Sequence, residues 1–271
     1  MTATLTAPPT ATDAPSRVGV LDGLRQTGTL AWRTLARLRH DPSELVGLSV
    51  MPIILTLMFT FVFGGAISGD TTSYIQFLLP GILVGNMLFA TADVGQGLNS
   101  DLSKGVFDRM RALPIARWAP LAGRILAEQF KQVWSILVVL VVGLLLGFRP
   151  ENGAGGFLAA TVLVLLFALA SSWVAVWIGV TVKQPEQVSM FSMAVLLPLC
   201  FASGQFSPPE TMPGWLRWFA EVNPVGVLMA ACRGLMNGGG AAVQVAWTLG
   251  WIVLMTAVFG WLSVAALRKR V

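Results

Sequence analysis

Charged residues are scarce in this sequence. They make up 11% of its 271 residues, whereas an ordinary soluble domain contains roughly 25%. Hydrophobic residues account for 55%. The composition therefore excludes an ordinary soluble domain and indicates a membrane protein.

Histidine and cysteine are also rare. His40 is the only histidine, and the two cysteines, Cys200 and Cys232, lie in or beside apolar segments without a CxxC spacing. We therefore expect no metal site. A disulfide between Cys200 and Cys232 requires that both face outward, and two packed apolar cysteines are the favoured interpretation.

The sequence lacks the motifs that catalysis or nucleotide binding would need. It has no GxxxxGK[ST] loop to hold phosphates, and no Ser/His/Asp or Cys/His arrangement. The net charge is +5, but the basic residues lie at the ends of apolar runs and form no stripe for a nucleic acid. We expect neither an enzyme nor a nucleic-acid-binding protein, so any ATP must be hydrolysed by another chain.

Long apolar runs dominate the rest of the chain. A helix needs roughly 20 residues to cross about 30 Å of hydrocarbon. Three of the six runs of that length contain an interior proline (Pro52, Pro80 or Pro198), which a spanning helix tolerates when neighbouring groups satisfy the freed carbonyl. The sequence predicts an all-α membrane protein with six transmembrane helices, at about 45–66, 75–99, 120–147, 157–182, 188–206 and 245–267.

Two segments precede the first span. Residues 1–20 contain no apolar region long enough for a signal peptide, and their composition predicts a disordered cytoplasmic tail. Between residues 22 and 41, apolar positions such as Leu24 and Ala31 fit a helical stripe, with arginines elsewhere. This pattern predicts a helix on the membrane surface, and a solvated helix is the alternative. The transmembrane domain is expected to occupy residues 21–271.

Basic residues are distributed unevenly between the two sides. With both termini in the cytoplasm, the outer segments contain only Arg149, Arg217 and Arg233, Lys131 falls within the third span, and all other basic residues lie inside. Positive residues are retained on the cytoplasmic side during insertion. We therefore expect a multi-pass protein of the cell (inner or plasma) membrane with both termini in the cytoplasm.

Two segments between the fifth and sixth spans are not expected to cross. Residues 207–224 contain three early prolines and then Trp215 and Trp218, typical of a short amphipathic helix with both tryptophans as anchors at the outer interface. Residues 225–236 are apolar, but they are too short to span and contain Arg233. Together the two segments predict an extracellular re-entrant helical hairpin.

A polar segment, SDLSKGVFDRMRALPIARW at 100–118, separates the second and third spans. Gly105 and Pro114 bracket enough residues for about two helical turns. Phe107 and Met110 are available to insert into a groove, with charged residues on the sides. Such a helix suits docking into another protein, and a solvated loop whose charges only set the orientation is the alternative.

Four ionisable residues lie in the second and third spans: Asp93, Arg124, Glu128 and Lys131. The last three are spaced four and three residues apart, so they share a helix face. A charge at the bilayer centre costs roughly 2.5 to 3.5 kcal/mol, which favours pairing, and Asp93 can meet Arg124 because the two spans are antiparallel. The residues predict an ion-pair cluster at the inner mouth. An ion pair that fixes helix packing is the favoured role for these residues. The alternative is that they line the inner mouth of a transport pathway or act as a relay there.

Four stretches carry a resemblance to a known family: FLLPGILVGNMLF (77–89), GVFDRMRALPIARW (105–118), LLLGFRP (144–150) and SGQFSPPETMPGWLRWFAEVNPVGVLMAACRGL (203–235). They resemble the membrane subunit of ABC exporters of the type-2 permease family, most closely the daunorubicin-resistance-type permeases of actinobacteria. The resemblance implies an N-terminal interfacial helix, six spans, a coupling helix after the second span and an outward re-entrant hairpin. The coupling residues that it implies are Lys104, Phe107, Asp108, Arg109, Met110, Arg111, Leu113 and Pro114.

The function expected on this basis is that of a permease subunit of an ATP-driven exporter for a hydrophobic or amphipathic small molecule. Its partners would be two copies of an ATP-binding subunit, which hold the ATP and Mg, a second permease chain in a homodimer, and membrane lipids. The Met- and Phe-rich faces of spans one, two and five suit a hydrophobic drug. Export of a lipid or lipid-linked glycan and a non-transporting scaffold are the alternatives.

Overall fold

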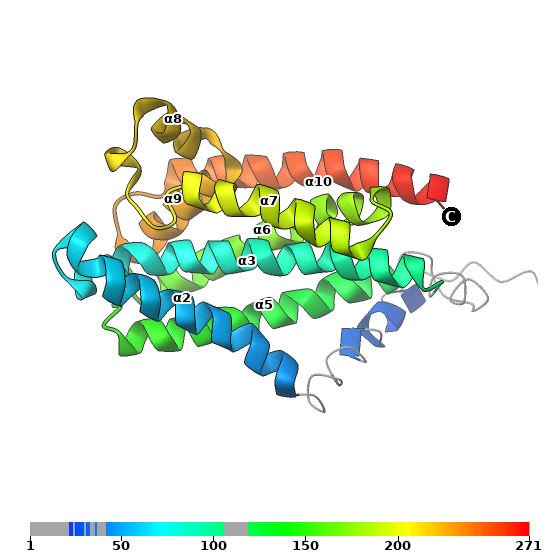
Figure 1. The fold of residues 1–271 in the computed structure, drawn as a ribbon, viewed down its shortest axis with the longest axis horizontal. Coiled ribbons are helices and arrows are strands. Elements are labelled where there is room, and N and C mark those ends of the chain that lie inside the picture. Colours follow the sequence, from blue (N-terminus) through cyan, green and yellow to red (C-terminus); the bar gives the residue numbers. More distant parts are fainter. Residues whose placement is uncertain are drawn as a thin grey trace, which may run out of the picture.

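The computed structural model describes residues 22–23, 25–29, 31–32, 36, 42–105 and 119–270, and every regular element within them is a helix (Figure 1). The elements are α2 (Pro42–Ser68), α3 (Thr71–Ser103), α5 (Ala119–Leu145), α6 (Gly153–Thr181), α7 (Pro185–Ala202), the 3-10 turn η1 (Pro209–Thr211), α8 (Gly214–Val222), α9 (Pro224–Asn237) and α10 (Ala242–Arg270).

Two of the helices begin at side chains that cap them. Asp70 precedes α3, and its carboxylate accepts hydrogen bonds from the Ser73 amide at 2.6 Å and the Ser73 hydroxyl at 2.7 Å. These bonds hold the pKa of the Asp70 carboxyl below its ordinary value. Asn223 precedes α9, and its Oδ1 accepts from the amides of Val225 at 3.0 Å and Gly226 at 2.8 Å. Such acceptors satisfy first-turn amides that have no intrahelical partner.

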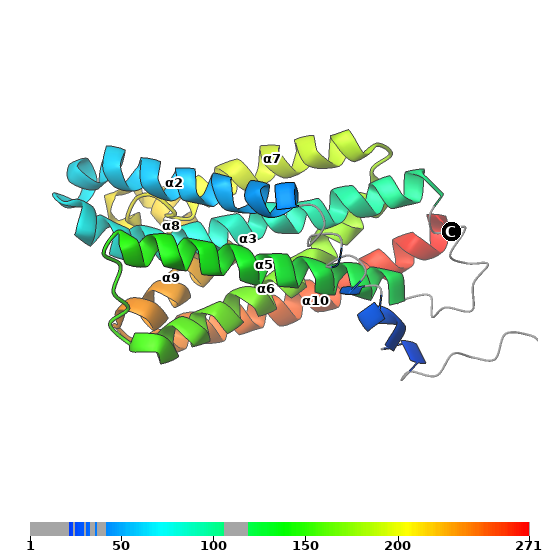
Figure 2. The same ribbon diagram turned by 90° about the horizontal axis from the view of Figure 1, so that it is seen from below.

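The six long helices run alternately in opposite directions (Figures 1 and 2). The last residues of α3, the connection from α6 to α7 and the C-terminal residues of α10 therefore lie at one end of the bundle. We call it the inner end, after the orientation that the sequence predicts. The helices α8 and α9 lie at the other, outer end.

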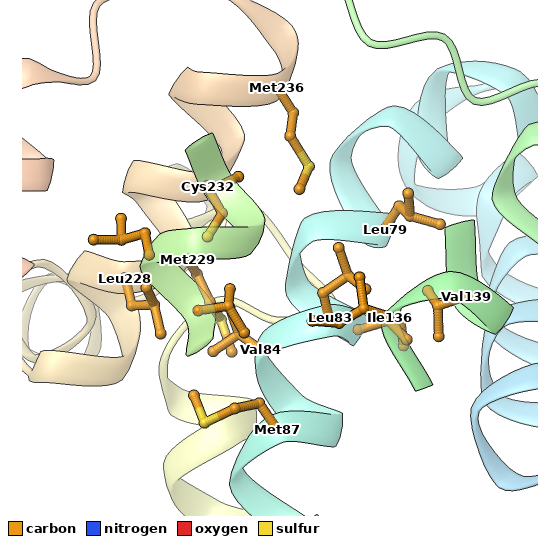
Figure 3. Close-up of a cluster of buried hydrophobic side chains, with 14 of the residues drawn as sticks. Leu79, Leu83, Val84, Met87, Ile136, Val139, Leu228, Met229, Cys232 and Met236 are labelled. Atoms are coloured by element: carbon orange, nitrogen blue, oxygen red, sulfur yellow. The ribbon is translucent and has the colours of Figure 1, made fainter. Parts of the chain in front are cut away.

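Helix α3 lies at the centre of the bundle. It contacts α2, α5, α6, α7 and α9, and 67% of its most apolar stretch is buried. Most of the apolar surface of this span therefore belongs to the chain's own core, although its Met- and Phe-rich face was predicted to suit a hydrophobic drug. Figure 3 shows part of that core, with side chains of α3 between those of α5 and α9. The labelled residues are Leu79, Leu83, Val84 and Met87 of α3, Ile136 and Val139 of α5, and Leu228, Met229, Cys232 and Met236 of α9.

The prediction of six spanning helices is confirmed. Six helices among the described residues are long and apolar enough to cross a membrane: Leu45–Ser68, Thr71–Ser103, Ala122–Leu145, Gly153–Thr181, Pro185–Ala202 and Ala242–Ala266. The predicted limits lie within four residues of these. The three interior prolines fall within α2, α3 and α7 as expected.

Three of these spans leave most of their apolar surface uncovered by the described chain. The buried share of the most apolar stretch is 17% for α2, 17% for α7 and 6% for α10. Phe61, Phe191 and Trp261 are among their exposed side chains. Apolar area of this extent is covered by lipid or by another chain in a membrane protein.

The segment before α2 is described only in part. Residues 25–29 are helical, and Thr27 and Ala31 lie on a covered face while Trp32 is exposed. The predicted tail at 1–20 lies outside the described residues. Cys200 and Cys232 are both buried and free, which fits the favoured interpretation of packed apolar cysteines.

Candidate functional site

The segment that the sequence analysis selected for docking joins the inner ends of α3 and α5. Helix α3 ends at Ser103. The exposed Lys104 is its C-cap, and Gly105 follows with a positive φ of 64° that terminates the helix. The connecting residues 106–118 lie outside the described residues. They include the remaining predicted contacts, Phe107, Asp108, Arg109, Met110, Arg111, Leu113 and Pro114.

An ion pair joins α3 and α5 close to this segment. Arg124 of α5 donates through Nη1 to Oδ2 of Asp101 on α3. The guanidinium lies over Gly97, where a Cβ would occupy its space. Arg124 was expected to meet Asp93. It meets Asp101 instead because Asp101 and Arg124 lie at similar distances from the inner ends of their antiparallel helices, whereas Asp93 is ten residues before the end of α3.

The inner end of α3 is also fixed to α6. The buried Asn99 donates through Nδ2 to the carbonyl of Gly179 at 2.8 Å and to that of Val182 at 2.6 Å. Gly179 lies in the last turn of α6 and Val182 caps that helix, and carbonyls at a helix end take donors from outside the helix. One turn earlier the two backbones touch, because a Cβ on Gly95 would lie 2.5 Å from the carbonyl oxygen of Ala175. Both helices that flank the segment 106–118 are thus anchored in the bundle.

The remaining charges of the predicted cluster lie deeper along α3 and α5. Lys131 donates to Oε1 of Glu128 at 3.1 Å, and both side chains are nearly buried. The amide nitrogen of Gln132 on the same helix is buried and has no hydrogen-bond partner among the described residues. Asp93 lies at a depth close to that of Glu128, at an exposed position of α3. The predicted cluster therefore separates into an Asp101–Arg124 pair at the end and a deeper group around Glu128.

Residues 203–237 form a cap at the outer end, made of η1, α8 and α9 (Figure 1). Trp215 and Trp218 of α8 are 72% and 64% exposed. On the same helix Arg217 donates to Glu221 at 2.8 Å, and this bond raises the pKa of the arginine above its ordinary value. Helix α8 thus presents two aromatic rings and a charged pair away from the chain.

The cap is attached through polar side chains that the sequence analysis did not select. Asn223 joins its two helices, because its Nδ2 donates to the Phe219 carbonyl at 2.8 Å while its Oδ1 caps α9. Asn152, before α6, donates to the carbonyl of Leu235 at 2.9 Å. Asn99 and Asp101 were also missed. Each is a polar residue at the end of an apolar run, and that position is the signal that could have found them.

Comparison with known proteins places this architecture in a family. The family described as ABC-2 type transporter matches residues 25–237. The daunorubicin resistance ABC transporter permease protein DrrB1 of Streptomyces coeruleorubidus is 39% identical over 244 residues, which are 90% of this chain and 86% of that protein.

More distant relatives carry similar names. The probable doxorubicin resistance ABC transporter permease protein DrrC of Mycobacterium tuberculosis is 27% identical over 83% of this chain and 80% of its own length. A putative transport permease, ycf38, of Porphyra purpurea is 22% identical over 78% of this chain and 73% of its own length. The family implies an ATP-binding-cassette partner in a separate chain. This protein belongs to the ABC-2 type transporter family, as a multi-pass membrane permease.

Proposed function

We propose that this chain is the permease subunit of an ATP-driven exporter that moves a hydrophobic or amphipathic antibiotic or natural product out of the cell. The observation that carries the proposal is the similarity to drug-resistance permeases over nearly the whole chain. ATP and Mg would be held by two copies of the ATP-binding partner. The apolar surface of α2 and α7 supports a substrate of low polarity.

The coupling helix in this proposal comprises residues 104–114. Its support is the rigid attachment of the helices on either side: Asp101 pairs with Arg124, and Asn99 holds the end of α6. A push on the connecting segment would therefore be passed to α3, α5 and α6 together. Phe107 and Met110 are proposed as the apolar knobs, with Arg109 and Arg111 as polar contacts.

The proposed orientation has the inner end and both termini in the cytoplasm and the cap of residues 203–237 outside. The distribution of basic residues supports it. Residues 22–41 would form the interfacial helix, and α8 and α9 the re-entrant hairpin. The exposure of Trp215 and Trp218 supports their role as anchors at the outer headgroup layer.

The proposed pathway lies between two copies of this chain, on the face formed by α2 and α7. A run of aromatic rings crosses this face: Phe63 is 5.2 Å from Phe59, Phe59 is 3.9 Å from Phe206, and Phe206 is 4.8 Å from Phe201, centroid to centroid. Phe63 and Phe201 at its two ends are partly exposed. Flat apolar molecules stack favourably on such rings.

The test is purification of the tagged chain from native membranes in mild detergent, with identification of partners and an ATPase assay with and without hydrophobic drugs. We expect an ATP-binding-cassette protein to co-purify and drugs to stimulate its hydrolysis. Exchange of Phe107 and Met110 for Asp should abolish drug export. The matched control exchanges both for Leu, which keeps the apolar knobs and should keep export.

The alternatives predict other results. Export that persists in the Asp variant would overturn the docking proposal. Lipid export would be indicated by a different set of results. The chain would recruit an ATPase, no drug would change the rate of ATP hydrolysis or be exported, and an envelope lipid would accumulate inside a deletion strain. If no ATPase co-purifies under several conditions, the scaffold interpretation replaces the exporter.

A further inference from the structure

Helix α3 contains a break in its hydrogen-bond ladder near its outer end. Pro80 lies inside the helix and has no amide hydrogen, so the carbonyl of Gln76, four residues earlier, loses its intrahelical donor. A carbonyl left unsatisfied where water is scarce destabilises a membrane protein. Neighbouring helices, side chains or ordered water can supply the missing donor.

Helix α9 supplies that donor. Asn237 donates through Nδ2 to the carbonyl of Gln76 at 2.7 Å. One turn earlier on the same face of α9, Arg233 donates through Nε to the next carbonyl of α3, that of Phe77, at 3.1 Å. The two side chains are four residues apart, so a single helix face contacts two consecutive carbonyls beside the proline.

The guanidinium of Arg233 connects α3 to the cap as well. Its Nη2 donates to the carbonyl of Gly204 at 2.6 Å, and its Cζ lies 3.7 Å from the centroid of the Phe77 ring. The backbone of the cap reaches this point because α3 has glycine there. A Cβ on Gly81 would lie 2.7 Å from the carbonyl oxygen of Gln205.

We propose that Arg233 and Asn237 are positioning residues that clamp the cap of residues 203–237 to α3 at its proline break. The clamp stabilises the break and makes the outer turns of α3 and the cap move as one unit. Because α3 continues as a helix from this point to its inner end at Ser103, movement at the inner end is passed to the cap. The transport consequence rests on the proposed function, whereas the clamp itself does not.

The clamp is tested by a double-mutant cycle on thermal unfolding of the permease purified with its partner. In the native Pro80 chain, Asn237→Leu leaves the Gln76 carbonyl without a donor and should lower the unfolding midpoint by several degrees. In a Pro80→Ala chain the amide of residue 80 takes over that carbonyl. Asn237→Leu should then lower the midpoint by less than half as much.

The matched control replaces Pro52, the interior proline of α2. Helix α9 has no contact with α2 among the described residues, so Pro52→Ala should leave the effect of Asn237→Leu unchanged. An equal loss in the native chain and in the Pro80→Ala chain would overturn the clamp. So would a native chain that tolerates Asn237→Leu without a change in midpoint.

Transport provides a second readout that loss of stability alone would not explain. Arg233→Met and Asn237→Leu should retain the ATP-binding partner and basal hydrolysis but lose most drug export, while Asn237→Gln, which keeps the donor, should export. Full export in both clamp-breaking variants would refute the mechanical role. If the native chain neither binds an ATPase nor exports, the proposed function fails, and the unfolding cycle still decides on the clamp.

Discussion

At the scale of single residues, glycines on α3 decide how closely its neighbours approach. Gly95 contacts the backbone of α6, the Arg124 guanidinium packs against Gly97, and the backbone of the cap packs against Gly81. Small residues of this kind allow helices in membranes to pack backbone against backbone. The consequence can be measured most directly at Gly95, because backbone atoms oppose it.

Gly95→Ala is expected to destabilise the permease by about 1 to 3 kcal/mol, the usual cost of overpacking. The added methyl would lie 2.5 Å from the Ala175 carbonyl oxygen, which cannot move without shifting α6. Gly65→Ala in α2 is the control, because nothing lies within 4 Å of that position. The thermal unfolding midpoint should fall for Gly95→Ala only, and equal midpoints would show that α3 and α6 are more loosely packed than described.

At the scale of elements, the Asp101–Arg124 pair joins α3 and α5, the two helices on either side of the proposed coupling helix. The side chains are 39% and 26% exposed, so the pair should contribute no more than about 1 kcal/mol to stability. Its expected importance lies in alignment. Arg124→Asp should weaken drug stimulation of the ATPase several-fold, and the exchanged pair, Arg124→Asp with Asp101→Arg, should recover it.

The control for this experiment is the pair between Arg217 and Glu221 on α8, which is similar in chemistry but lies at the outer end. Arg217→Asp should leave drug stimulation near the native value. If both single variants reduce stimulation equally, the effect is one of general stability, and alignment of α3 with α5 is not its cause.

At the scale of the whole molecule, the orientation in the membrane can be measured with a charged maleimide that does not cross it. Lys104→Cys should react only in inverted vesicles, and Trp215→Cys only in intact cells. The parent chain is the control. Its cysteines, Cys200 and Cys232, are 1% and 0% exposed, so it should remain unlabelled. Labelling of both variants from the same side would contradict the topology.

Much of the fold could be predicted because a spanning helix is recognised by its length and composition. The six spans and the exclusion of 225–236 from them needed no contact information. The site was less predictable. Arg124 was recognised as needing a partner, but its choice of Asp101 depends on where α3 and α5 end relative to each other. Arg233 was recognised as a basic residue of the outer segments and as an obstacle to crossing, but not as a donor, although Pro80 already implied a carbonyl in need of one.

The sequence by itself determined how many helices are long and apolar enough to cross the membrane, because transfer of each run into lipid depends on the run alone. It also determined the family, because similarity over the chain is a property of the sequence. Only the tertiary structure decided that α3 is central while α2, α7 and α10 are left uncovered. The reason is that apolar residues are spread around α3 and α10 without gathering on one helical face, so periodicity marks no face for the core. Which helix is covered depends instead on close approach at glycines and on hydrogen bonds between elements, such as those from Asn99, Arg233 and Asn237.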